Sequence, residues 1–177
     1  MKRAKRIGLR PRTTVTQHVS ASSLPPAETL WQVACNLWDR KRFKQAFQFM
    51  SEAAEAGCDS AQVDLGYFYD VGIGVAKNPK LAKFWYRRSA AAGNAAGAYN
   101  LGILYRDLQR KTTARAWFNR AIELGDEDGH IELARMHMSS RRVNHRAAKQ
   151  HLRTVLRSKK SHPDSKRTAA ALLAEIE

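Results

Sequence analysis

The sequence predicts an all-α solenoid of about four helix–turn–helix repeats followed by a C-terminal capping helix. The first observation is that glycines ending apolar helical segments recur at Gly57, Gly93 and Gly125, at intervals of 36 and 32 residues. The second is that a leucine and then a small residue follow each of these glycines at a constant distance. The third is that an alanine precedes each glycine at a constant distance. One helical hairpin cannot bury its apolar stripe alone, so such units are stable when stacked.

The repeated positions lie on helices. The leucine with its small neighbour is found at Leu65-Gly66, Leu101-Gly102 and Leu133-Ala134. The alanine opens a stripe of apolar residues at positions 0, +3, +4, +7 and +8, which is one face of an α-helix. This alanine is Ala46, Ala82, Ala114 and, in a weaker fourth copy, Ala148.

Each unit is therefore read as a helix A, a loop and a helix B. The expected A and B helices are 28–39 and 43–56, 60–70 and 79–92, 95–106 and 111–124, and 128–138 and 145–158, with a last helix at 168–177. The glycines suit the left-handed position after a helix. Candidate N-caps are Asp59, Ser60, Asn78 before Pro79, Asn94 and Asp126. The expected domain organisation is a disordered basic tail over 1–27 and a repeat domain over 28–177.

The residues resemble the Sel-one-like repeat family, a relative of the tetratricopeptide repeat. The residues that carry the resemblance in 61–93 are Ala61, Leu65-Gly66, Tyr69, Gly72-Ile73-Gly74-Val75, Ala82, Trp85-Tyr86, Ala90 and Gly93. In 97–125 they are Leu101-Gly102, Tyr105, Ala114, Trp117-Phe118 and Gly125. The resemblance implies a right-handed α–α superhelix whose A helices line its concave side. It also implies an adaptor role with no particular partner.

Large aromatic residues recur in pairs along the B helices, at Trp85-Tyr86 and Trp117-Phe118. Their constant phase predicts that they form the core between hairpins rather than a ligand site.

A second set of side chains lies on the A helices, on the side away from the expected core. The set is largely apolar or aromatic, whereas a solvated face should be polar. We expect it to form a groove for an extended peptide or an amphipathic helix, with the tyrosines partly exposed. The alternative is that these side chains pack against the neighbouring A helix. The candidate residues are Trp31, Val63, Tyr67, Asp70, Tyr99, Ile103, Arg106 and Arg135.

The net charge of +15 is concentrated at the ends of the chain. Residues 1–27 carry six basic residues and no acidic one, residues 28–134 are nearly balanced, and residues 135–167 have a net charge of +10. On the last B helix the basic residues recur every three or four positions. The candidate basic face is Arg141, Arg142, Arg146, Lys149, Arg153 and Arg157. Three interpretations remain open: a solvated surface, a nucleic acid or other polyanion partner, and an acidic protein surface.

The sequence contains no motif that predicts catalysis. It has no phosphate loop, nucleophile elbow or pair of carboxylates with an evident role, and its six histidines and two cysteines lack metal-ligand spacing. We therefore expect no catalytic residue, no metal and no cofactor. No apolar run is long enough to span a membrane, and the basic start lacks the apolar segment of a secretory signal. A cytoplasmic location is expected, with a mitochondrial presequence as the alternative reading of the start.

Two functions remain at this point. The first is a protein-binding adaptor or scaffold that uses the A-helix groove. The second is a nucleic-acid-associated protein that uses the basic tail and the basic C-terminal repeat.

Overall fold

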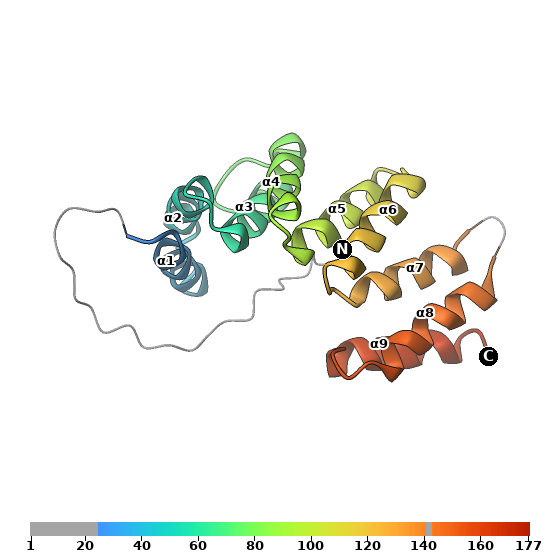
Figure 1. Ribbon diagram of the computed structural model, residues 1–177. Helices are drawn as coiled ribbons and strands as arrows, with labels where there is room; N and C mark the ends of the chain where they lie inside the picture. Colours follow the sequence, from blue (N-terminus) through green and yellow to red (C-terminus); the bar gives the residue numbers. More distant parts are fainter. Residues whose placement is uncertain (1–24, 141–142) are drawn as a thin grey trace. The chain divides into compact units, whose positions relative to one another are not determined.

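The computed structural model describes residues 25–140 and 143–177, and within these ranges every regular element is an α-helix (Figure 1). The helices are α1 (Ala27–Asp39), α2 (Phe43–Glu55), α3 (Asp59–Val71), α4 (Pro79–Ala91), α5 (Ala95–Asp107), α6 (Lys111–Glu123), α7 (Asp128–Met138), α8 (His145–Arg157) and α9 (Pro163–Ala174). Helices α1, α3, α5 and α7 are the A helices, and α2, α4, α6 and α8 are the B helices.

The first eight helices begin and end within one residue of the expected bounds, but the prediction for the last helix was wrong. Helix α9 begins at Pro163 rather than at residue 168, and it ends at Ala174. Pro163 suits the first turn of a helix because it has no N–H to leave unpaired, and the His162 ring accepts a hydrogen bond from the Asp164 N–H. The expected disordered tail lies almost wholly outside the described residues, and α1 begins at Ala27.

Two of the predicted N-caps are confirmed, whereas α3 is capped by Cys58 and the N-cap residue of α7 is Glu127 rather than Asp126. Asn78 and Asn94 accept hydrogen bonds from the first turns of α4 and α5, as predicted. The cap of α3 is Cys58, whose Sγ accepts from the Ala61 N–H at 3.4 Å, so Asp59 and Ser60 lie inside the helix instead of capping it. Asp126 Oδ1 accepts from the Asp128 N–H at the start of α7.

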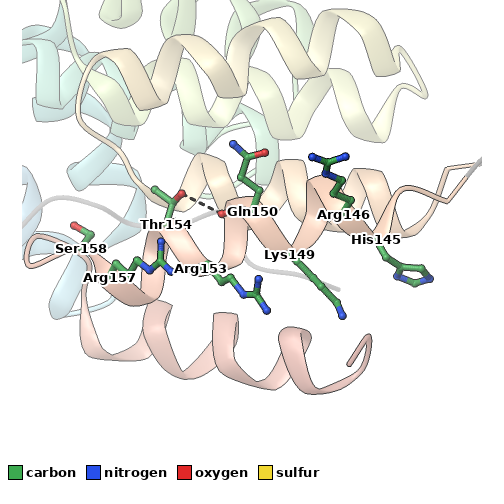
Figure 2. A pocket seen from close by; sticks show the side chains of 8 residues that line it. All are labelled: His145, Arg146, Lys149, Gln150, Arg153, Thr154, Arg157 and Ser158. Carbon is green, nitrogen blue, oxygen red and sulfur yellow. Dashed lines mark hydrogen bonds between the residues drawn. The ribbon is translucent and has the colours of Figure 1, made fainter.

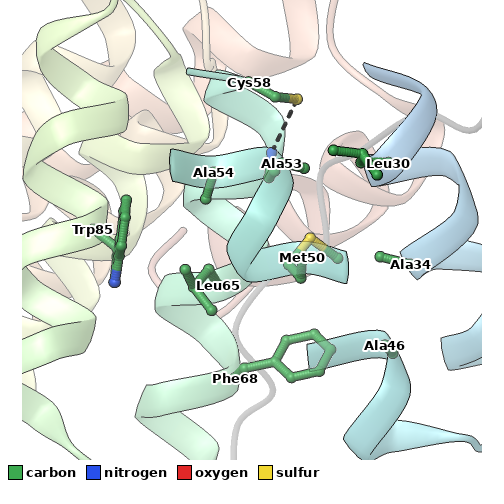
Figure 3. Close-up of a cluster of buried hydrophobic side chains, with 11 residues drawn as sticks. Leu30, Ala34, Ala46, Met50, Ala53, Ala54, Cys58, Leu65, Phe68 and Trp85 are labelled. Atoms are coloured by element: carbon green, nitrogen blue, oxygen red, sulfur yellow. Dashed lines mark hydrogen bonds between the residues drawn. The ribbon is translucent and has the colours of Figure 1, made fainter. Parts of the chain in front are cut away.

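The described chain divides into two compact units, of which the first ends at Ala92. In this unit α1 pairs with α2, α3 pairs with α4, and α2 also packs on α3. Its apolar core contains Leu30, Met50, Leu65, Phe68 and Trp85 from all four helices (Figure 3). Trp85, at the repeated aromatic position of the B helix α4, therefore packs the second hairpin against the first.

The second unit runs from Gly93 to Glu177 and contains α5 to α9. Helix α5 pairs with α6, α7 pairs with α8, and α9 packs against both α8 and α7. Leu152 and Val155 of α8 are fully buried and share a cluster with Ile131 of α7 and Ala169 of α9. Helix α9 thus covers the apolar side of the last hairpin, as a terminal cap does in a repeat protein.

Each hairpin closes where a small residue of the A helix meets a large residue of the B helix. A Cβ added to Gly66 would lie 2.6 Å from the Tyr86 ring, and one added to Gly102 would lie 2.5 Å from the Phe118 ring. The glycines therefore leave room for the rings. Trp85, Tyr86 and Phe118 are buried as predicted, whereas Trp117 is only half-buried.

Candidate functional site

In the first unit, the candidate A-helix residues lie between α1 and α3. Trp31 Nε1 donates a hydrogen bond to Asp64 Oδ2 at 2.8 Å, and both side chains are half-buried. The Tyr67 ring lies 6.2 Å from the Trp38 ring, and Tyr67 is also half-buried. These side chains thus contact the neighbouring A helix, and each also keeps a part exposed.

Two expectations about exposure were wrong. Val63 is buried at 5% exposure, and Tyr99 is buried at 8%, whereas the groove required both to face outward. The Tyr99 ring lies 5.8 Å from the Phe118 ring, so it packs on the core of its own hairpin. Burial is the main cause that raises the pKa of Tyr99, and the nearby charges of Glu132 and Asp126 add to it. Tyr99 therefore supports the fold rather than an open surface.

In the second unit, the candidate residues Arg106 and Arg135 are joined by a buried carboxylate. Arg106 Nη1 lies 2.6 Å from Glu132 Oε2, and Arg135 Nη1 lies 2.5 Å from Glu132 Oε1. The Glu132 side chain is only 4% exposed, while the Arg106 and Arg135 side chains are 26% and 34% exposed. Arg106 also donates hydrogen bonds from Nε and Nη2 to Asp107 Oδ1. The two arginines are thus held in place with part of each side chain accessible, and Ile103 is half-buried.

Glu132 belongs to a repeated polar position that the sequence reading missed. It directly precedes the repeat leucine, and the equivalent residues are Gln32, Asp64, Asn100 and Glu132. Asn100 is buried, and its Oδ1 accepts no hydrogen bond from any described residue. The recurrence of a polar residue directly before the repeat leucine was the signal that could have found it.

The candidate basic face lies along the outer side of α8. Figure 2 shows a shallow open groove lined by Arg146, Lys149, Arg153 and Arg157, with polar side chains between them. Helix α8 contains no acidic residue. Arg153 makes an exposed ion pair with Glu177 at 3.5 Å, which contributes little to stability because solvent screens it. Arg141 and Arg142 lie outside the described residues.

The basic residues of the described helices are concentrated on the B helices. Helices α4, α6 and α8 carry eleven Lys and Arg residues and one acid, Glu123. The A helices α3, α5 and α7 carry six acidic residues and only two arginines. The apparent balance of residues 28–134 therefore hides a separation of charge between the two kinds of helix. The regular A–B alternation could have revealed it.

Three histidines of the last hairpin also meet. His130 Nδ1 and His151 Nδ1 lie 2.9 Å apart, and the His137 ring stacks on His151 at 5.8 Å. Burial and the neighbouring positive groups lower the pKa of His151 to about 4, so the ring is neutral near pH 7. Among the described residues, no group of three or more His, Cys, Asp or Glu side chains is placed to hold a metal ion.

These features define a helical-repeat protein. The Sel1 repeat family model matches residues 40–58 and 59–94, and the tetratricopeptide repeat family model matches residues 95–125. A Sel1 repeat protein from Oxalobacter formigenes has a similar structure, with a TM-score of 0.63 at 20% identity, covering 84% of this chain and 72% of that chain. A protective antigen of uropathogenic Escherichia coli with an SLR fold has a TM-score of 0.65 at 20% identity, covering 84% of this chain and 38% of that chain.

A curated relative matches a shorter stretch. The chitin synthase regulator SKT5 of Saccharomyces cerevisiae is 48% identical over 50 residues, which is 28% of this chain and 7% of that protein. The chain thus spans a small part of that relative's length. Residues 40–125 are thus Sel1 and tetratricopeptide repeats, and the described chain is an all-α helical-repeat solenoid.

Sel1 and tetratricopeptide repeats generally serve as protein–protein interaction modules. A bilayer-spanning helix must be long and continuously apolar, and none of the helices in residues 25–140 and 143–177 meets that requirement.

Proposed function

We propose that the chain is an adaptor that holds a segment of a partner protein against its A helices. The observation that carries this proposal is the set of half-exposed side chains on α1 and α3, in which Trp31 donates a hydrogen bond to Asp64 and the Tyr67 ring lies near the Trp38 ring. Tyrosine and tryptophan with an apolar body and a polar tip are frequent anchors of protein interfaces.

The charge of these helices indicates the chemistry of the partner. Helices α1 and α3 contain five acidic residues and no lysine or arginine. A partner segment with apolar and basic side chains would complement this surface, while a polyanion would be repelled by it. In the second unit, the partly exposed arginines held by Glu132 supply N–H donors that a backbone carbonyl or a carboxylate of a partner would accept.

The repeats themselves offer a substitution that tests the proposal without disturbing the fold. The positions equivalent to Tyr67 hold Cys35, Ile103 and Arg135, so the helix geometry accepts an arginine there. Tyr67→Arg removes the ring and adds a positive charge to the acidic surface. Far-UV circular dichroism and thermal unfolding of the purified variant would establish that it is folded.

The test is affinity capture from cells with the parent, Tyr67→Arg and a matched control, Arg153→Glu on α8, each with and without nuclease. The proposal expects nuclease-insensitive protein partners that the folded Tyr67→Arg variant loses and Arg153→Glu keeps. Partners retained by Tyr67→Arg, or lost on nuclease treatment alone, contradict it.

A second candidate function is polyanion binding by the basic face of α8. It is favoured by the open groove in which four cationic side chains line one helix without an acid among them. Phosphate contacts are strongly salt-dependent, so each lost contact lowers the slope of log affinity against log salt by about one unit. Reversing charge at Arg146 and Lys149 should lower that slope for a duplex DNA probe. An unchanged slope would remove this candidate.

A further inference from the structure

Helix α4 carries two exposed apolar residues, Leu81 and Phe84, together with four cations, Lys80, Lys83, Arg87 and Arg88, and we call this set the α4 patch. Phe84 is 52% exposed and Leu81 is 37% exposed, and both are among the large apolar residues left most accessible in the described chain. A shallow hollow of about 440 Å³ beside them is lined by Phe84 and by Lys80, Lys83, Arg87 and Arg88. Helix α4 contains no acidic residue.

The repeat does not require these apolar residues. Counted from the repeat alanine, the positions equivalent to Phe84 hold Gln48, Ala116 and Gln150. The positions equivalent to Leu81 hold Gln45, Thr113 and Ala147. Other hairpins of the chain therefore pack with small or polar side chains at both places. Exposed apolar side chains that the fold does not use are typical of an interaction surface.

The patch is also held in place by the core. The Phe84 ring meets the buried Trp85 ring edge-on at 5.1 Å, and the Arg88 guanidinium lies over the same indole at 5.4 Å from its centroid. Trp85 is only 8% exposed and belongs to the core of the first unit. A ring and a cation fixed on a buried anchor lose little freedom when a partner binds.

We propose that the α4 patch binds an acidic segment of a partner protein that also carries apolar side chains, such as an acidic amphipathic helix. The cations complement the acidic groups, and the hollow beside Phe84 accepts an apolar side chain of the segment. A nucleic acid strand is a poorer match because successive bases need several aromatic rings to stack on, and this patch offers only Phe84. Such a strand would also make no use of the exposed Leu81. A lipid bilayer is a poorer match because membrane-binding helices insert protruding apolar side chains into the lipid, whereas this surface contains a hollow.

The test uses labelled peptides of about four helical turns with the full-length protein, read by fluorescence anisotropy. One peptide combines Glu with Leu at helical spacing, a second replaces each Glu by Lys, and a third replaces each Leu by Ser. Oligothymidylate and vesicles of phosphatidylserine with phosphatidylcholine are the competing probes. The proposal expects saturable binding of the first peptide and much weaker binding of the other two.

The variants locate the binding on the protein. Phe84→Gln installs the residue that two other repeats carry and should weaken binding of the first peptide about tenfold or more, without changing the melting temperature. Lys80→Glu should weaken it as well. The matched control is Lys44→Glu, at the equivalent exposed position of α2, and it should bind as the parent does.

Three outcomes would overturn the proposal. The first is that the acidic apolar peptide does not bind. The second is that it binds equally well to Phe84→Gln and to the parent. The third is that the nucleic acid or the vesicles bind in a manner that depends on Phe84 while the peptide does not, which would identify one of them as the occupant instead.

Discussion

The close approach of Gly66 to Tyr86 leads to a quantitative prediction about how the hairpins pack. A Cβ at Gly66 would lie 2.6 Å from Tyr86 Cδ1 and Cε1, whereas carbon atoms in contact lie about 3.5–4.0 Å apart. Tyr86 is fully buried, so its ring has no space into which to move. Overpacking of this kind costs about 1–3 kcal/mol, and replacing a mid-helix glycine by alanine returns about 1 kcal/mol. Because two contacts are as short as 2.6 Å, the overpacking cost lies in the upper part of that range, at about 2–3 kcal/mol, so Gly66→Ala should lower the free energy of unfolding by about 1–2 kcal/mol.

The repeats also indicate the compensating change. Where the small position holds alanine, the equivalent of Tyr86 is not aromatic: Ala34 corresponds to Met50, and Ala134 to Leu152. Tyr86→Leu should therefore relieve the clash, and the double variant should be more stable than the two single effects predict, by about 1–2 kcal/mol. The assay is urea unfolding of the parent, both single variants and the double variant, followed by far-UV circular dichroism. Additive effects, or a Gly66→Ala protein as stable as the parent, would refute the packing argument.

Three further predictions concern the buried groups. Trp85→Ala and Tyr99→Ala should each lower the free energy of unfolding, measured by chemical denaturation, by about 3–5 kcal/mol. Tyr67→Ala should lower it clearly less because Tyr67 is only half-buried. Equal decreases for Tyr67→Ala and Tyr99→Ala would contradict this difference in burial. Glu132→Gln should lower the free energy of unfolding by about 1–2 kcal/mol, because the two arginines would lose their carboxylate partner. The same denaturation assay measures this change. A variant as stable as the parent would argue against a stabilising role of the Arg106–Glu132–Arg135 ion pairs. Because the pKa of His151 is lowered to about 4 in the folded protein, the unfolded chain binds this proton first as the pH falls, so the contribution of His151 to stability is fully present above pH 6.5 and is lost towards pH 4. His151→Asn should therefore make the melting temperature depend less on pH between these values. A melting temperature with the same pH dependence as that of the parent would contradict this.

The helices were predictable because their signals are local and repeated. The apolar stripe, the glycine after each B helix and caps such as Asn78 and Asn94 each lie within a few residues of the boundary that they determine. The start of α9 was missed because Pro163 and His162 lie within the basic stretch of residues 135–167, ahead of the apolar run that predicted the helix, and no repeat copy exists for comparison.

Exposure was harder to predict than secondary structure. Tyr67 and Tyr99 occupy neighbouring repeats on the same side of the A helix, yet only Tyr99 packs on a buried B-helix ring. The exposure of a side chain depends on which residues the adjacent helix places opposite it, and the spacing within one helix does not contain that information. The role of Glu132 was not predicted for the same reason, because it depends on an ion pair with Arg106 from another helix.

Photo-crosslinking in cells tests the central claim most directly. A photoreactive amino acid would replace Tyr67 on α3 or Ile103 on α5, and the control would replace Gln48, an exposed residue on the outer side of α2. If the A helices hold a partner segment, positions 67 and 103 should give discrete protein adducts that survive nuclease, and position 48 should give none of them. Adducts that form equally from position 48, or that nuclease removes, would contradict the proposed adaptor role of the A helices.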